Sequence, residues 1–315
     1  MRSKQILSAV RAVALSCIGM LAAACGVEGV DDFTDEEVVI EGTQQELLIN
    51  NDDDRTRVTQ AQASAYPWRA VAAIRLTPNI TTASCSAFKV GPRHLLSAGH
   101  CFYEAGPGGT AALKVAQSSF RLVYGQYGSG NDVSNMPVNG HKVAIEALYV
   151  PPAYIGSNAT STVDDWALIR VANSESLPGW FRTRAFTNVE IPQLPEARST
   201  GFPLPTQTCA ASPLANTQCG GYQYYASLAE NGGLGVSASF IDTQSDWTTG
   251  QSGGPVFAKI SGQADPDQRW AMGIVHGSGT ANSFARRITS VISQKVCQEI
   301  AAFPSTAIPN VQCTP

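Results

Sequence analysis

The apolar residues of this 315-residue chain fall into short runs, and glycine-rich turns separate the runs. Turns are indicated where small, polar and glycine residues cluster, as in Gly106–Gly109 and Gly128–Asp132. Many short strands joined by such turns favour a β-sandwich or a β-barrel. We predict strands over Ala70–Leu76, Ala87–Val90, His94–Ser97, Phe120–Tyr124, Lys142–Val150, Trp166–Val171, Tyr222–Ala226, Gly235–Ile241, Pro255–Ile260 and Trp270–Val275.

Only the segment Ile288–Ala301 has the apolar spacing of a helix. The composition, 43% hydrophobic and 15% charged, is that of a globular protein. The length is enough for one large all-β domain or two small ones. The sequence therefore predicts a mostly β protein that ends in one helix.

The segment Thr249–Phe257, TGQSGGPVF, places Ser252 in a glycine-rich turn ahead of a predicted strand. Gly250 allows a bend in which its own N–H and that of Ser252 point at one spot, and such a pair of donors forms an oxyanion hole. Gly253 and Gly254 keep side-chain bulk away from the Ser252 hydroxyl. Ser252 is the candidate nucleophile.

Two further motifs supply the partners that a nucleophilic serine needs. His100 follows the predicted strand His94–Ser97, and Asp165 opens an apolar run. A serine requires a base to take its proton, and the base requires a carboxylate that fixes its tautomer. The neighbouring Asp164 is interpreted as a solvated turn acid.

These three motifs resemble those of the chymotrypsin-like (trypsin-like) serine endopeptidases. The matching segments are Ala98–Cys101, Asp165–Leu168 and Gly250–Pro255. The likeness spans about residues 48–300, and some features are similar to the bacterial glutamyl endopeptidase branch. Those features are Asn51–Val58, Cys85–Pro92, Gly201–Pro203 and His276 after Gly273-Ile274.

The resemblance implies an all-β fold of two antiparallel six-stranded barrels with a C-terminal helix. The peptidase domain would cover residues 55–315, with barrel 1 at about 58–175, barrel 2 at about 185–290, and the helix and tail at 288–315. A crossing near residues 172–185 would place His100 and Asp165 on barrel 1 and Ser252 on barrel 2. The active site would lie between the barrels.

The resemblance also implies a mechanism. Ser252 attacks the peptide carbonyl, His100 takes its proton and returns it to the leaving amine, and Asp165 orients His100. The N–H groups of Gly250 and Ser252 stabilise the oxyanion. We expect protein or peptide substrates, no cofactor and a monomer. No His or Cys pair has zinc spacing, and no basic stripe indicates nucleic acid.

Two residues suggest opposite substrate charges, and the sequence leaves both specificities open. Glutamyl endopeptidases use a histidine at the end of this strand to meet a substrate carboxylate, and His276 resembles it. The animal-trypsin pattern instead aligns His276 one place later, as a wall residue whose backbone pairs with substrate. Asp246 stands where trypsin-like members attract Arg or Lys. Trp247 could narrow or roof the same pocket. Gln251 replaces the aspartate that pairs with the new N-terminus in trypsinogen activation, so that activation route is not expected.

The N-terminus has the pattern of an export signal over residues 1–24, with basic residues before an apolar run. Cleavage is predicted before Cys25 by two overlapping motifs: an ordinary signal-peptidase site and an imperfect bacterial lipoprotein box. Eight cysteines without Cys17 of the signal leave seven, and lipidation of Cys25 leaves an even six. We expect an exported bacterial protein tethered through Cys25, with plain secretion as the alternative.

The six remaining cysteines are expected to form disulfides, as in other exported proteins. Their order suggests the pairs Cys85–Cys101, Cys209–Cys219 and Cys297–Cys313. The first pair resembles the family bridge that holds the histidine loop.

Residues 26–54 contain eleven acidic residues and no Lys or Arg, whereas eighteen basic and fourteen acidic residues follow residue 54. This change of sign indicates that residues 25–54 are a propeptide or tether distinct from the folded domain, as in a zymogen. His94 and His141 are interpreted as surface residues. A non-catalytic surface binding protein that retains the fold is the rival from another class, because a fold does not guarantee activity.

Overall fold

The computed structural model describes residues 55–77, 83–124, 142–172, 179–204, 222–228, 234–260, 268–278, 282–306 and 313. The chain divides into two units, Met1–Glu41 and Gly42–Pro315, and every described residue belongs to the second. The predicted signal, the acidic segment, the Cys25 lipidation and the Cys209–Cys219 bridge lie outside the described residues and stay predictions. Where the chain is described, no helix is long and apolar enough to span a membrane.

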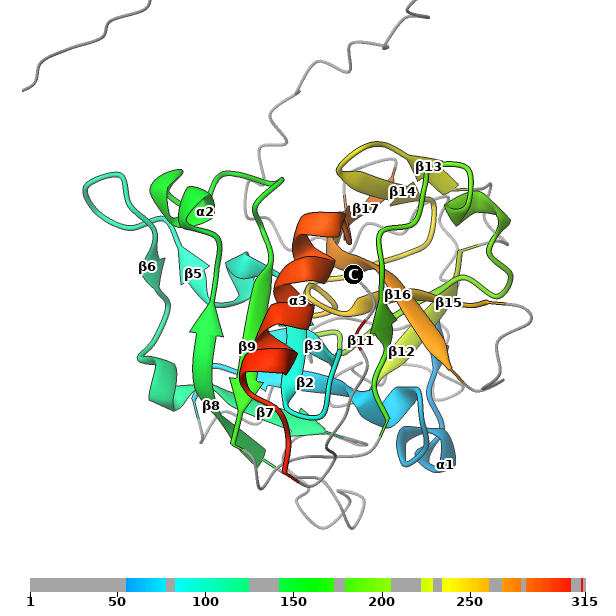
Figure 1. The fold of residues 1–315 in the computed structure, drawn as a ribbon, viewed down its shortest axis with the longest axis horizontal. Coiled ribbons are helices and arrows are strands. Elements are labelled where there is room, and N and C mark those ends of the chain that lie inside the picture. The colour runs from blue at the N-terminus through cyan, green and yellow to red at the C-terminus, as the bar shows by residue number, and fades with distance from the viewer. Residues whose placement is uncertain are drawn as a thin grey trace, which may run out of the picture. The chain divides into compact units, whose positions relative to one another are not determined.

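Six antiparallel strands close into a barrel in the first half of the chain (Figure 1). The closed order is β2 (Val71–Arg75), β3 (Cys85–Lys89), β4 (His94–Ser97), β9 (Ala167–Val171), β8 (Lys142–Tyr149) and β7 (Arg121–Tyr124). β2, β3 and β4 are buried along their whole length. Because these strands contact the second sheet or the C-terminal helix as well as the barrel core, their sequences lack the alternation typical of a strand with one wet face.

The second half forms a nine-stranded sheet rather than the second closed barrel that we predicted. The path runs through β1 (Thr56–Arg57), β12 (Tyr224–Ser227), β11 (Arg198–Gly201), β15 (Pro255–Lys259), β16 (Arg269–Ser278), β17 (Ser283–Arg287), β14 (Phe240–Thr243) and β13 (Leu234–Val236), and β10 (Arg182–Thr183) pairs with β16. Among the described strands the sheet is open: β1 pairs with β12 at one end of the path, through Thr56↔Tyr225 and Arg57↔Tyr224, and β13 pairs only with β14 at the other end.

The boundaries between the two halves also differ from the prediction. Barrel 1 begins at Val71 rather than near residue 58, since Val58 N–H donates to Gln223 O in the second half. The chain leaves the barrel after Val171 and joins the second sheet at Arg182. The predicted crossing near residues 172–185 falls between these two strands and stays a prediction.

Most predicted strands are present within two residues of their expected ends, but Gly235–Ile241 is wrong as a single strand. It contains the turn between β13 and β14, in which Phe240 N–H donates to Ser237 Oγ at 2.9 Å. The polar elements that hydrophobic periodicity missed include β1, β10, β11 and β17. The short elements outside both sheets are α1 (Gln60–Ala63), η2 (Trp68–Ala70), η3 (Gly99–Cys101), β5 (Tyr103–Glu104), β6 (Ala112–Leu113), η4 (Gln117–Ser119), α2 (Pro152–Gly156) and η6 (Ile191–Gln193).

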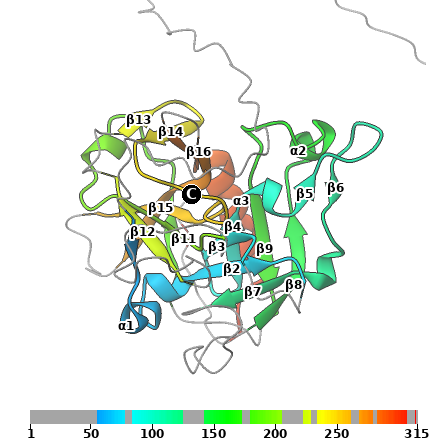
Figure 2. The same cartoon turned by 180° about the vertical axis from the view of Figure 1, so that it is seen from behind.

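The predicted C-terminal helix is α3 (Ser290–Ala302). Its buried face presents Ile292, Val296 and Ile300, whereas Val291 is 66% exposed. α3 runs along the boundary between the barrel and the second sheet in both views (Figures 1 and 2). The helix thus returns the end of the chain to the barrel, where its apolar face joins the barrel core.

Two of the predicted disulfides are present, Cys85–Cys101 and Cys297–Cys313. The first joins β3 to η3, and the second joins α3 to the C-terminal tail. Disulfides of this kind persist in oxidising compartments, which supports export of the protein.

The interpretation of His94 as a surface residue is wrong. His94 is 1% exposed in β4, and neither of its ring nitrogens has a hydrogen-bond partner among the described residues. Burial lowers the pKa of His94 to about 4, with Arg93 and Arg170 adding to the decrease and Glu299 opposing it. The fold therefore holds this imidazole neutral.

We expect His94 to make the protein acid-labile. A group whose folded pKa lies below its unfolded value of about 6.5 must bind a proton on unfolding, so stability falls as the pH drops from about 6.5 towards about 4. The shift corresponds to about 3 kcal/mol. Urea unfolding at pH 7 and pH 4 should show that His94→Leu loses less stability than the wild type, and equal losses would contradict this.

Candidate active site

Strand pairing brings His100 and Asp165 together. β4 and β9 are antiparallel neighbours, and Ser97 at the end of β4 pairs with Ala167 at the start of β9. His100 lies in η3 just after β4, and Asp165 lies just before β9. Both residues therefore emerge at the same edge of the barrel. The Cys85–Cys101 disulfide ties η3 back to β3.

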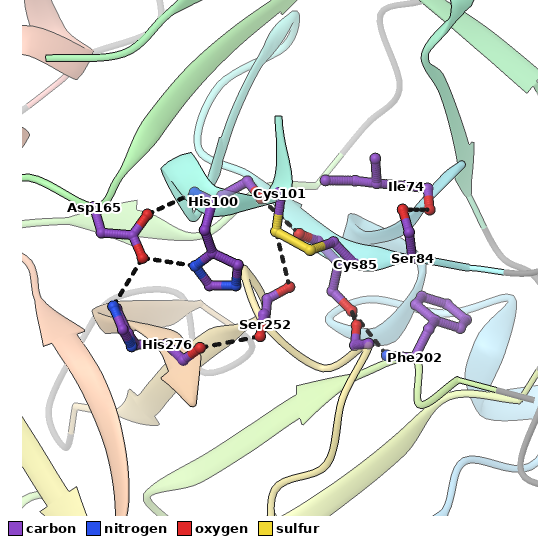
Figure 3. Close-up of a disulfide and its surroundings, with 12 residues drawn as sticks. Ile74, Ser84, Cys85, His100, Cys101, Asp165, Phe202, Ser252 and His276 are labelled. Atoms are coloured by element: carbon purple, nitrogen blue, oxygen red, sulfur yellow. Dashed lines mark hydrogen bonds and ion pairs between the residues drawn. A yellow bond between two sulfur atoms is a disulfide. The ribbon is translucent and has the colours of Figure 1, made fainter. Parts of the chain in front are cut away.

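The Asp165 carboxylate accepts three hydrogen bonds, although the residue is only 2% exposed. Oδ1 accepts the backbone N–H of His100 at 2.7 Å, and Oδ2 accepts His100 Nδ1–H at 2.6 Å. Oδ2 also accepts His276 Nε2–H at 2.8 Å (Figure 3). Burial alone would raise the pKa of Asp165, but the charges and hydrogen bonds of His100 and His276 together lower it well below its ordinary value.

An ionised carboxylate only accepts hydrogen bonds, and this fixes the tautomers of both histidines. His100 carries its proton on Nδ1, which leaves Nε2 able to accept a proton. Figure 3 shows the His100 ring between Asp165 and Ser252. This is the arrangement that a general base beside a nucleophile requires.

Two glycines with positive φ shape the loop around Ser252. Gly250 has φ +96° and Gly253 has φ +83°, a region that side chains rarely adopt. A Cβ at Gly253 would lie 2.1 Å from Ser86 O and 2.2 Å from Ser97 Oγ. Gly253 therefore allows the loop to approach the first barrel, whereas the sequence suggested only that it clears space beside the Ser252 hydroxyl.

The N–H groups of Gly250 and Ser252 donate to no atom of the described residues. The carbonyl of Thr249 accepts Leu204 N–H at 2.8 Å. Because the C=O and N–H of a trans peptide point in opposite directions, this bond turns Gly250 N–H away from Leu204. Two backbone donors are thus left to meet an oxyanion.

Ser86 links the first barrel to this loop, a role that nothing in the sequence indicated beyond its place next to Cys85. Ser86 is 0% exposed. Its N–H donates to Ser252 O at 2.7 Å, and its hydroxyl donates to Gly250 O at 2.9 Å. The same hydroxyl accepts Phe202 N–H at 2.8 Å. The Cys101 Sγ lies 3.7 Å from Ser252 O as a packing contact, since a disulfide sulfur has no proton to donate.

Arg55 is a second residue that sequence reasoning missed. It is 1% exposed, and Nη1 donates to Thr248 Oγ1 at 2.9 Å. Thr248 N–H donates to the buried Gln251 Oε1 at 2.9 Å. Gln251 thus holds its own loop by a neutral hydrogen bond, at the position where trypsinogen-type activation would need an aspartate.

The Ser252 hydroxyl donates to His276 O at 3.0 Å. In this conformation the hydroxyl proton points at the His276 carbonyl rather than at His100. To donate to His100 Nε2, the Ser252 hydroxyl would have to turn away from His276 O, and catalytic hydrogen bonds commonly form or tighten only when substrate binds.

Comparison with known proteins agrees with this geometry. The family model named Trypsin matches residues 56–298. The chain belongs to the trypsin family. The glutamyl endopeptidase of Bacillus licheniformis is 37% identical over 76 residues, an alignment that covers 23% of this chain and 22% of that protein. The chain thus matches about a fifth of that relative's length.

Solved structures share the fold of this trypsin-family chain. A Glu endopeptidase in complex with MPD matches with a TM-score of 0.53 and 17% identity, over 81% of this chain and 100% of the other. The VesB protease of Vibrio cholerae matches with a TM-score of 0.53 and 16% identity, over 78% of this chain and 67% of the other. At these identities the likeness concerns the fold alone.

Within this trypsin-family site, the three predicted specificity residues, Asp246, Trp247 and His276, are all largely buried. Trp247 is 1% exposed, and its indole N–H donates to Ser199 Oγ at 2.6 Å in the core of the second sheet. Its role in narrowing or roofing the pocket stays a prediction. Asp246 is also 1% exposed. The His276 side chain is 10% exposed with Nε2 on Asp165, so a substrate contact would have to use its other ring nitrogen.

Asp164 behaves as the sequence indicated for a turn acid. It accepts Ser161 Oγ–H at 2.8 Å and is half-buried, away from the contacts of His100. Of the two neighbouring acids in this trypsin-family chain, Asp165 is the one that contacts His100.

Ligand atoms of His100, Asp165 and His276 lie within 4.8 Å of one another. Their nitrogen–oxygen distances of 2.6 and 2.8 Å are those of hydrogen bonds. A tetrahedral zinc ion would hold two such ligand atoms about 3.3 Å apart. The observed spacing therefore fits two histidines hydrogen-bonded to Asp165 better than a metal centre.

Proposed function

We propose that this protein is an exported serine endopeptidase in which Ser252, His100 and Asp165 form the catalytic triad. The observation that carries the proposal is the 2.6 Å hydrogen bond between His100 Nδ1 and Asp165 Oδ2, with Ser252 beside the His100 ring. It fixes the tautomer in which His100 Nε2 accepts a proton. Membership of the trypsin family supports the same reaction class and peptide or protein substrates.

The reaction would proceed through an acyl-enzyme. The Ser252 hydroxyl passes its proton to His100 Nε2 as Oγ attacks the peptide carbonyl carbon. The N–H groups of Gly250 and Ser252 meet the developing oxyanion, and Asp165 stabilises the imidazolium. His100 then protonates the leaving amine. In the second half of the reaction, water gives a proton to His100 and attacks the acyl-enzyme, which frees Ser252 and releases the new carboxyl terminus.

We further propose that the residue before the cleaved bond is preferentially acidic. The similarity to a glutamyl endopeptidase supports this preference. The alternative is an Arg or Lys preference set by Asp246, whose side chain is buried. The two alternatives differ in the charge of the preferred substrate and are separable with two peptide series.

A fluorophosphonate probe tests the proposed function. The processed wild-type protein should be labelled on Ser252, and both Ser252→Ala and His100→Ala should abolish labelling. Folded, processed wild-type protein that resists the probe would instead support the rival non-catalytic binding protein. An unlabelled sample of the same preparation should also cleave peptides after Glu faster than after Arg, and the reverse order would favour Asp246 as the specificity residue.

A further inference from the structure

His276 lies in β16 at an irregularity of the sheet. The pairing between β16 and β17 shifts there, from Val275↔Ala285 to Gly277↔Phe284, so His276 is the extra residue of a β-bulge. Bulges redirect the side chain of the extra residue. At this bulge the imidazole ring of His276 meets the buried carboxylate of Asp165.

The His276 ring is held on several sides. Nε2 lies 2.8 Å from Asp165 Oδ2, and the ring centroid lies 5.4 Å from that of His100. The Phe240 ring packs edge-on at 6.3 Å. The side chain is only 10% exposed, so the hydrogen bond to Asp165 is largely shielded from water. A hydrogen bond to a charged group is worth more than a neutral one, and shielding strengthens it.

The backbone of the same residue contacts the nucleophile. The His276 carbonyl accepts the Ser252 hydroxyl at 3.0 Å. One residue therefore contacts both ends of the triad, Asp165 through its ring and Ser252 through its carbonyl.

We propose that His276 is a positioning residue of the triad: its Nε2–H fixes the Asp165 carboxylate, and its carbonyl holds the Ser252 hydroxyl until substrate binds. This inference rests on the proposed function. It differs from a specificity role, because a positioning residue affects the chemical step equally for every substrate. Without the His276 donor, Asp165 keeps only its two bonds to His100 and can rotate away from the geometry that orients that ring.

The kinetic test uses His276→Leu, which removes the donor, and His276→Gln, whose amide N–H can replace it. We expect His276→Leu to lower kcat by about 10- to 100-fold, by the same factor for peptides cleaved after acidic, neutral and basic residues, with KM little changed. His276→Gln should recover most of kcat. Phe240→Leu, which alters packing beside the ring without removing a donor, is the control and should retain kcat within a few-fold. A loss confined to acidic peptides would overturn the proposal in favour of a specificity role.

A second measurement does not depend on activity. In ¹⁵N-histidine-labelled wild-type protein, His276 should be protonated on Nε2 and His100 on Nδ1, each with a low-field proton. His276→Gln should remove the first signal and keep the second. A His276 protonated only on Nδ1 would overturn the positioning role even in an active enzyme. Failure of the wild type to react with the fluorophosphonate probe would instead refute the proposed function.

Discussion

Asp165→Asn should lower kcat by about 10⁴-fold and leave the fold intact, a loss of the size known for this change in a trypsin-type triad. The amide cannot accept all three hydrogen bonds that reach the Asp165 carboxylate from His100 and His276. An amide N–H facing His100 Nδ1 favours the tautomer with its proton on Nε2. That tautomer has no lone pair for the Ser252 proton, so general-base catalysis is lost.

The matched control is Asp164→Asn, which replaces the adjacent acid and changes the net charge by the same amount. Because Asp164 contacts Ser161 rather than His100, kcat should change by no more than a few-fold. Steady-state kinetics and circular dichroism of both variants provide the test. A severe loss in Asp164→Asn with a mild one in Asp165→Asn would refute the assignment of the triad acid.

Gly253→Ala should destabilise the protein by more than about 4 kcal/mol and abolish activity. The new methyl group would lie 2.1 Å from Ser86 O and 2.2 Å from Ser97 Oγ, and both are held in the first barrel. The loop would have to withdraw, which breaks the bond from Ser86 N–H to Ser252 O. The oxyanion donors would then move with the loop.

Gly108→Ala separates this clash from backbone strain. Gly108 has the same φ of +83°, but a Cβ there meets nothing within 4 Å. It should therefore cost only the strain of a positive φ, about 1 kcal/mol, with activity unchanged. Urea unfolding and probe labelling compare the two variants. Equal losses of stability would show that strain, and not contact with Ser86 and Ser97, governs Gly253.

The sequence by itself determined the chemistry of the candidate site. Ser252, His100 and Asp165 stand in local motifs whose residue types are set by the reaction. The glycines around Ser252 indicate a backbone conformation that other residues rarely adopt. Strands with dense apolar runs and the helical spacing near the C-terminus were also predictable, because burial selects apolar residues with the period of the element.

The predictions failed where contacts between distant segments decide the outcome. β11 (Arg198–Gly201) is polar in sequence and becomes a central strand only because β12 and β15 flank it. Thr56 and Arg57 form a strand of the second sheet only because they pair with β12, which is distant in sequence. His94 is buried because β4 lies in the closed barrel and also contacts α3 and β16. None of these pairings has a local signal.

The same holds for the finer geometry of the site. A shift of one residue in strand register reverses the face on which a side chain lies, so the direction of His276 could not be read from its position in the chain. The bulge between β16 and β17 turns it to Asp165. Ser86 joins the barrel to the Ser252 loop across 164 residues of sequence. The sequence determined which groups can react, and the tertiary structure decided which of them meet, because hydrogen bonds form only between atoms that the fold brings within reach.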